Sequence, residues 1–124
     1  MRLFVISLLC FFPLIGSAQN CEDYKTGTFK CRLEGGEWIE NYKIIRKNKW
    51  QLEYSPDGFN KSKVVWLDSC SYDLIHIKSD YLDLPKGNVT HVKIVRTTKN
   101  GYVAVGSSDA FPGRQRRIEM EQVE

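Results

Sequence analysis

The sequence lacks most of the patterns that would assign it a chemistry. It has no Cys-x-x-Cys pair, so neither a thiol redox motif nor a zinc knuckle is indicated. It has no glycine-rich phosphate loop, because Gly35-Gly36 lies between two predicted strands and is typical of a hairpin turn. No serine lies in a nucleophile-elbow pattern, and the acidic residues are scattered. These absences predict that the protein is not an enzyme.

A strong charge of either sign is also missing. The 124 residues include 18 Lys and Arg against 15 Asp and Glu, a formal net charge of +3. The two basic clusters, residues 46–49 and 114–117, are typical of solvated turns rather than of a nucleic-acid-binding face. The chain contains no repeat, low-complexity tract or linker, so we expect one domain and no nucleic-acid partner.

The longest apolar run, residues 3–15, is too short for the ~20 residues of a membrane span. Arg2 precedes it and the small residues 16–18 follow it, which is typical of a secretory signal peptide. We therefore predict cleavage after residue 18, a mature domain of residues 19–124, and a secreted or periplasmic location without a stable membrane span. A retained anchor is the alternative.

Export would place the remaining cysteines where disulfides form and persist. Cys21, Cys31 and Cys70 are an odd number, so one should stay free or pair between chains. We expect a Cys21–Cys70 disulfide, because it would tie the start of the mature chain to a mid-chain strand. Cys31 alternates with Phe29 and Leu33, which indicates a buried strand thiol. The spacing alone leaves the other pairings open.

Short alternating runs separated by turn residues predict an all-β domain with few helical signals. Eight strands are expected, at residues 28–33, 38–46, 50–54, 63–67, 71–78, 89–97, 102–106 and 116–123. Their short connections indicate a single-domain antiparallel up-and-down meander. Closing it into a small lipocalin-like barrel would remove its exposed edges, and a two-sheet sandwich is the alternative.

The hairpin about Asn48 is the best-defined strand pair. It gives three cross-strand pairs: Ile44 with Leu52, Tyr42 with Tyr54, and Lys43 with Glu53. Apolar pairs on one face and opposite charges on the other are typical of a half-buried hairpin.

Aromatic residues concentrate on the second to fifth predicted strands. If their inner faces share a space, they could line an apolar pocket with polar tips. These candidate ligand-lining residues are Trp38, Tyr42, Trp50, Tyr54, Trp66 and Tyr72. Core and cross-strand packing is the alternative, since strands favour aromatics in any case.

The two histidines, His76 and His91, flank a polar loop. In one register they face each other and could bind zinc or copper with Asp80 or Asp83. Matching the apolar residues of the two strands favours a different register, and a slip of one residue puts the histidines on opposite faces. We therefore expect no metal and no cofactor.

Residues 21–30, CEDYKTGTFK, resemble the opening of a family of short secreted bacterial proteins of unknown function. Residues 42–46 and 66–72 resemble later landmarks of that family. The resemblance implies cysteines at the positions of Cys21 and Cys70, and it implies no activity.

Residues 27–29, Gly-Thr-Phe, are similar to the Gly-x-Trp start of lipocalin-like (calycin) barrels. That resemblance implies an arginine late in the chain, Arg116 or Arg117, packed over the aromatic ring. A barrel this small is usually filled by its own side chains, which argues against a deep cavity.

These observations predict a non-enzymatic exported binding module for a small apolar ligand or for a protein surface. A purely structural or protein-interaction domain of the cell envelope, such as an inhibitor or assembly partner, is the alternative. An enzyme with a site built from loops is the third possibility.

Overall fold

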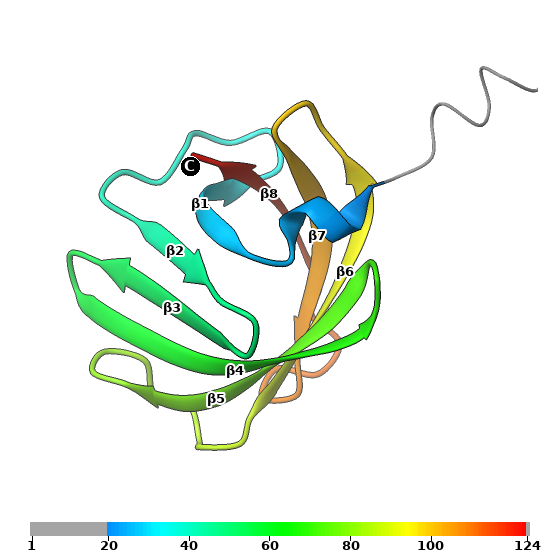
Figure 1. Cartoon of the computed structure of the whole chain (residues 1–124). Coiled ribbons are helices and arrows are strands. Elements are labelled where there is room, and N and C mark those ends of the chain that lie inside the picture. The colour runs from blue at the N-terminus through cyan, green and yellow to red at the C-terminus, as the bar shows by residue number, and fades with distance from the viewer. Residues whose placement is uncertain (1–19, 124) are drawn as a thin grey trace, which may run out of the picture.

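The computed structural model describes residues 20–123, so the predicted signal peptide lies outside the described residues. Its elements are a 3-10 helix η1 (Cys21–Tyr24) and the strands β1 (Gly27–Leu33), β2 (Lys43–Arg46), β3 (Trp50–Ser55), β4 (Gly58–Asp68), β5 (Ser71–Ser79), β6 (Val89–Thr97), β7 (Gly101–Ser108) and β8 (Arg116–Gln122). The strands follow one another around a closed antiparallel barrel, in which β1 also pairs with β8 (Figure 1). The predicted meander barrel is confirmed, and the two-sheet sandwich is excluded.

One predicted strand, residues 38–46, is much shorter than expected. β2 begins only at Lys43, and residues 34–42 form a connection instead. Asn41 has a φ of 57°, a left-handed conformation that interrupts an extended chain. The Ile39 N–H still donates to the Cys31 carbonyl at 3.1 Å, so the connection pairs with part of β1 that β2 leaves open.

Alternate residues along each strand face the inside of the barrel, as the pleat of a strand requires. On β6, for example, Val92 and Ile94 are buried whereas His91 and Lys93 are exposed. The inward side chains make one continuous core: Cys21, Tyr24, Phe29, Ile44, Val64, Tyr72, Val92, Ile94, Tyr102, Ala104 and Met120.

The β2–β3 hairpin has a register one residue away from the predicted one. Ile44 pairs with Glu53, and the Lys47 N–H donates to the Trp50 carbonyl at 2.8 Å, so the turn has two residues instead of three. A shift of one residue reverses the faces of a strand. Gln51 and Glu53 therefore face inward and the apolar residues of β3 face outward. The predicted pairs are wrong because they assumed that the apolar face of β3 is the buried one.

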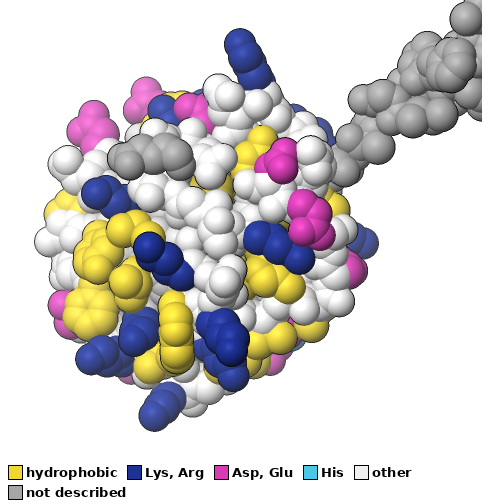
Figure 2. All heavy atoms as spheres, viewed as in Figure 1, with side chains coloured by type: hydrophobic (Ala, Val, Ile, Leu, Met, Phe, Trp, Pro, Cys, Tyr) yellow, Lys and Arg dark blue, Asp and Glu magenta, His cyan; other side chains and the backbone are white. Residues whose placement is uncertain are grey.

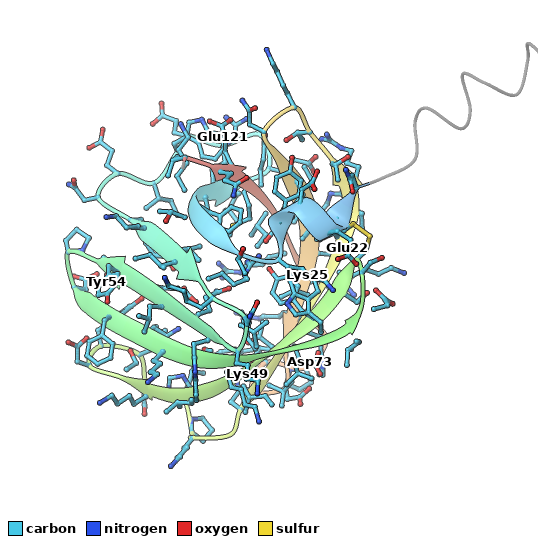
Figure 3. All side chains as sticks on the ribbon, viewed as in Figure 1. Glu22, Lys25, Lys49, Tyr54, Asp73 and Glu121 are labelled. Carbon is cyan, nitrogen blue, oxygen red and sulfur yellow. A yellow bond between two sulfur atoms is a disulfide. The ribbon has the colours of Figure 1, made fainter. Side chains whose placement is uncertain are left out.

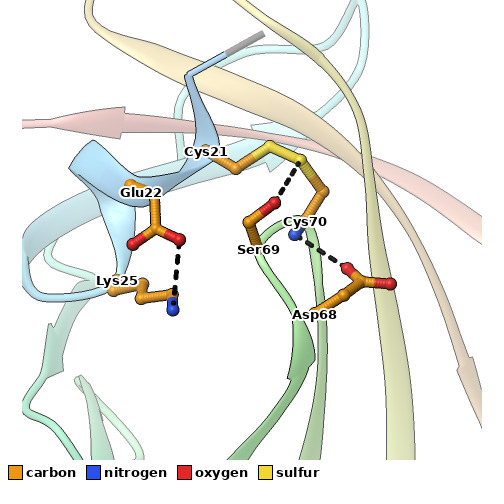
Figure 4. The surroundings of a disulfide bond; sticks show 6 residues. All are labelled: Cys21, Glu22, Lys25, Asp68, Ser69 and Cys70. Carbon is orange, nitrogen blue, oxygen red and sulfur yellow. Dashed lines mark hydrogen bonds and ion pairs between the residues drawn. A yellow bond between two sulfur atoms is a disulfide. The ribbon is translucent and has the colours of Figure 1, made fainter.

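One end of the barrel is covered by η1. The predicted Cys21–Cys70 disulfide is confirmed, and it joins η1 to the β4–β5 turn (Figure 4). Beside it, Asp68 Oδ1 accepts a hydrogen bond from the Cys70 N–H at 2.9 Å. The Tyr24 ring packs against Tyr102 with 5.7 Å between the centroids. Cys31 is the free cysteine among the described residues.

A buried arginine, Arg46, lies beneath η1 and is only 1% exposed. Its guanidinium lies over the rings of Phe29 and Tyr72, at 4.9 and 4.6 Å from their centroids. The expectation that Arg116 or Arg117 packs over Phe29 is therefore wrong, since an arginine from β2 occupies that place. Arg117 instead pairs with Glu34 on the outer surface, with Nε 2.6 Å from Oε1.

Candidate functional site

The barrel contains a cavity of about 440 Å³ in the half away from η1. The β5–β6 and β7–β8 loops contribute Leu82, Leu84 and Phe111 to its mouth. Most of the wall is apolar, with contributions from Ile44, Leu74, Val92, Ile118 and Met120. The size lies within the usual range of small-molecule sites, roughly 300–1,000 Å³. The expectation of a barrel filled by its own side chains is therefore wrong for this half of the molecule.

A connected group of polar side chains enters the cavity wall from β3, from β4 and from Tyr42, the residue just before β2. Glu53 accepts hydrogen bonds from the Tyr42 hydroxyl, from Gln51 Nε2 at 3.1 Å and from Asn60 Nδ2 at 3.4 Å. Gln51 Oε1 in turn accepts from Arg46 Nε at 2.9 Å. The buried arginine and the cavity carboxylate are thus linked through one amide, which orients both of them.

The interior of the barrel shifts the acid–base equilibria of several side chains, among them Tyr42 and Cys31. Burial, and then the negative charge of Glu53, raise the pKa of the Tyr42 hydroxyl, so this phenol stays protonated and donates to the carboxylate. The same two causes raise the pKa of the Cys31 thiol to about 11. Cys31 lines the cavity, but at neutral pH it is a neutral thiol rather than a nucleophilic thiolate.

Within residues 20–123, two polar atoms of the cavity wall have no hydrogen-bond partner, Asn60 Oδ1 and His76 Nδ1. Asn60 is 7% exposed and His76 is 5% exposed. Buried polar atoms in folded proteins nearly always have a partner, because an unpaired one costs about 1–3 kcal/mol. Both residues belong to the cavity wall, so their unpaired atoms lie next to the space that a bound molecule would occupy.

Only two of the six predicted ligand-lining aromatics, Tyr42 and Tyr72, belong to the cavity wall. Trp66 packs on Tyr72 with 4.6 Å between the centroids, and the Lys25 ammonium lies over its ring. Trp66 therefore does not line the cavity, and the prediction of a shared aromatic pocket is wrong for this residue.

The other three aromatics lie outside the barrel. Trp38 follows β1 and lies against Lys30 and Arg32. Trp50 and Tyr54 are 42% and 44% exposed on the outer face of β3. Figure 3 places Tyr54 at the outer edge of the barrel, and Figure 2 shows hydrophobic side chains among Lys and Arg on this side of the surface. The outward position of Trp50 and Tyr54 follows from the corrected register of the β2–β3 hairpin.

The two histidines lie on opposite faces of the sheet, because Asp73 rather than His76 pairs with His91. The His91 ring lies on the outer surface between Asp73 Oδ1 at 2.8 Å and Asp109 Oδ1 at 3.0 Å. Their carboxylates raise the pKa of His91 by hydrogen bonding. Within residues 20–123, no group of three His, Cys, Asp or Glu side chains is arranged to hold a metal ion.

The polar part of the site was not found from the sequence. Gln51 and Glu53 alternate with Trp50, Leu52 and Tyr54, and this pattern is typical of a strand whose apolar side is buried. The same alternation along β3 would have indicated the site if the polar residues, Gln51 and Glu53, had been assigned to the inner face and the apolar residues to the outer face. Only the strand register decides between the two interpretations.

Comparisons of this chain with protein-family models, with curated proteins and with solved structures find no significant match. The resemblances drawn from the sequence therefore remain predictions. In the described part of the chain, no helix has the length and apolar character needed to cross a membrane.

Proposed function

We propose that this protein is an exported, non-enzymatic carrier that holds a small, mainly apolar molecule inside its barrel. The observation that carries the proposal is the cavity of about 440 Å³ with a largely apolar wall. One half of the barrel is tightly packed beneath η1, whereas the other half retains this space. Burial of apolar surface in such a space supplies a binding free energy of roughly 25 cal/mol per Å² before the entropic costs of association.

Binding is favoured over catalysis by the chemistry of the wall. The raised pKa of Cys31 keeps its thiol neutral, and Glu53 is engaged by three neutral donors. Export is supported by the Cys21–Cys70 disulfide, since disulfides persist in oxidising compartments, and by the signal-like pattern of residues 1–18. The bacterial periplasm or the extracellular space fits both features.

Filling the cavity tests the proposal. Gly106 lines the cavity from β7, and a Cβ atom added there would meet only one atom within 4 Å, the His91 carbonyl oxygen at 3.9 Å. We expect wild-type protein to bind one equivalent of a neutral apolar fluorescent probe such as N-phenyl-1-naphthylamine, and Gly106→Phe to lose most of that binding while remaining folded. Leu67→Trp, which adds an aromatic ring at an exposed position, serves as the control. Equal probe binding by the wild type and by Gly106→Phe would contradict an interior site.

A further inference from the structure

Three acceptor-bearing side chains, Glu53, Asn60 and His76, lie next to one another in the cavity wall. The strand register places them together. Glu53 on β3 pairs directly with Asn60 on β4, and His76 on β5 pairs with Ser62, the next inward residue of β4. Three adjacent strands therefore present three polar side chains to one region of an otherwise largely apolar wall.

Each of these side chains has hydrogen-bonding capacity that the protein does not use. Asn60 donates to Glu53 through Nδ2, but its Oδ1 has no partner. His76 Nδ1 also has no partner, and it accepts a hydrogen bond when the ring proton is on Nε2. Glu53 Oε1 accepts only from the Tyr42 hydroxyl, which leaves one of its lone pairs open. The free capacity is thus three acceptors.

The Glu53 carboxylate also lacks a direct cationic partner among the described residues, and its charge acts on Arg46 only from beyond Gln51. Among the ion pairs of the described residues, none includes Glu53. Its three hydrogen-bond donors are the neutral groups of Tyr42, Gln51 and Asn60, and Arg46 is separated from it by Gln51. A carboxylate inside a protein is stabilised more strongly by a direct cationic partner than by neutral donors.

We infer that the ligand carries a primary ammonium group, bound by Glu53, Asn60 and His76, with its apolar part directed along the cavity towards Leu82 and Phe111. An alkylammonium head has three N–H donors and one positive charge, which matches three open acceptors and one carboxylate. This inference rests on the proposed function, and it replaces a generic apolar ligand with an amphiphilic amine.

The main competitor is a ligand with a carboxylate head. Arg114 and Arg116 lie at the mouth and would attract an anion there. Both are exposed, so water and salt screen their charges, whereas the three acceptors lie inside the barrel. An anionic head at the acceptors would face the Glu53 carboxylate, and an anionic head at the mouth would leave Asn60 Oδ1 and His76 Nδ1 unpaired.

Three ligands with the same alkyl chain separate these cases: octylamine, octanol and octanoate. Their affinities for the purified protein are measured at pH 7 by isothermal titration calorimetry. We expect octylamine to bind about tenfold or more tightly than octanol, since a hydrogen bond between charged groups is roughly twice as strong as one between neutral groups. Octanoate should be the weakest of the three. If octanol binds and octylamine binds no better, the ammonium site is overturned while the carrier function stands. If none of them binds and the apolar probe does not bind either, both proposals fail.

Matched variants then locate the effect. Glu53→Gln keeps the shape of the side chain and removes its charge, so octylamine should lose about tenfold in affinity or more while octanol changes by less than about threefold. Glu121→Gln removes an equal charge from the outer face of β8, where Glu121 pairs with Lys30, and should leave both affinities unchanged. An equal loss of octylamine affinity in both variants would show that the charge acts from a distance and would overturn the assigned site. If Glu53→Gln fails to fold, the three affinities of the wild-type protein still support or overturn the ammonium site.

Discussion

The Nη2 atom of Arg46 on β2 lies 2.9 Å from the hydroxyl of Tyr102 on β7, and it lies equally close to the hydroxyl of Tyr72 on β5. The Nη1 atom donates to the Tyr24 carbonyl of η1 at 2.9 Å. One guanidinium therefore joins three non-adjacent strands and the helix that covers the end of the barrel. The planar group of arginine, with five donors, suits this position better than a lysine ammonium.

The first prediction concerns this buried arginine. Arg46→Leu should lower the free energy of unfolding by about 2–4 kcal/mol, because the Tyr24 carbonyl and Gln51 lose their donors inside the protein. The two tyrosine hydroxyls still bond each other at 2.9 Å, which limits the loss. Urea unfolding followed by tryptophan fluorescence measures the change. Arg96→Leu, at an exposed position, should stay within about 0.5 kcal/mol of the wild type, and equal losses in the two variants would contradict a special role for Arg46.

The second prediction concerns the disulfide. Cys21 and Cys70 are 49 residues apart in sequence, so the chain-entropy model gives the bond a contribution of roughly 4 kcal/mol. The double variant Cys21→Ser, Cys70→Ser should unfold at a clearly lower urea concentration, and a reducing agent should affect the wild type in the same way. Ligand binding by its folded fraction should persist, because the disulfide lies at the end of the barrel away from the cavity. A wild type whose stability is unaffected by reduction would contradict this account.

The third prediction compares two glycines of β7. A Cβ atom at Gly101 would lie 1.8 Å from the Met120 carbonyl oxygen, so Gly101→Ala forces the backbones of β7 and β8 apart. We expect Gly101→Ala to lower the free energy of unfolding by about 1–3 kcal/mol, as substitutions at other overpacked sites do. Gly106→Ala meets no such obstacle, and it should raise the free energy of unfolding by roughly 0.5–1 kcal/mol, since glycine inside a strand is unfavourable. Thermal unfolding of the two variants tests the contrast, and similar shifts for both would refute it.

How far the sequence predicts this fold depends on the residue pattern of each strand. β6 alternates Val92 and Ile94 with His91 and Lys93, and its predicted bounds, residues 89–97, are correct. β3 carries an apolar set and a polar set on its two faces, and local alternation does not say which set the barrel encloses. That choice depends on the hydrogen bonds that Gln51 and Glu53 make with Arg46 and with other strands, and these contacts are not local in sequence.

The disulfide could be predicted because pairing Cys21 with Cys70 ties the start of the predicted mature chain to a mid-chain strand, although the cysteine spacing alone leaves the other pairings open. The mouth of the cavity could not be predicted, since Leu82 and Phe111 belong to loops whose positions are set by tertiary packing. The cavity exists because side chains fill one half of the barrel and leave space in the other. The alternation of residues along the strands does not show how completely the side chains fill the interior.

The fourth prediction concerns pH. The carboxylates of Asp73 and Asp109 raise the pKa of His91 above its usual 6.5. The protonated form is therefore favoured in the folded state. The stabilisation is fully present below about pH 6.5, and it is lost as the pH rises through the raised pKa. His91 is half exposed, so solvent screening should keep the contribution below about 1 kcal/mol. Urea unfolding between pH 5 and pH 9 should show a step that His91→Gln removes, and an unchanged profile in the variant would assign the step to another group.

The last prediction uses Cys31 as a reporter of the cavity. Its pKa of about 11 leaves a very small thiolate fraction at pH 8, so alkylation by iodoacetamide should be tenfold or more slower than for an exposed cysteine. The rate should rise with pH towards the pKa of the thiol. Since Cys31 lines the cavity, a bound ligand should slow the reaction further. Mass spectrometry of the alkylated protein, with and without octylamine, measures both effects, and urea-unfolded protein gives the rate of the accessible thiol. If Cys31 in the folded protein reacts as fast as in urea, the thiol is neither buried nor shielded by the barrel. If alkylation is slow but octylamine does not slow it further, the ligand lies outside this part of the cavity.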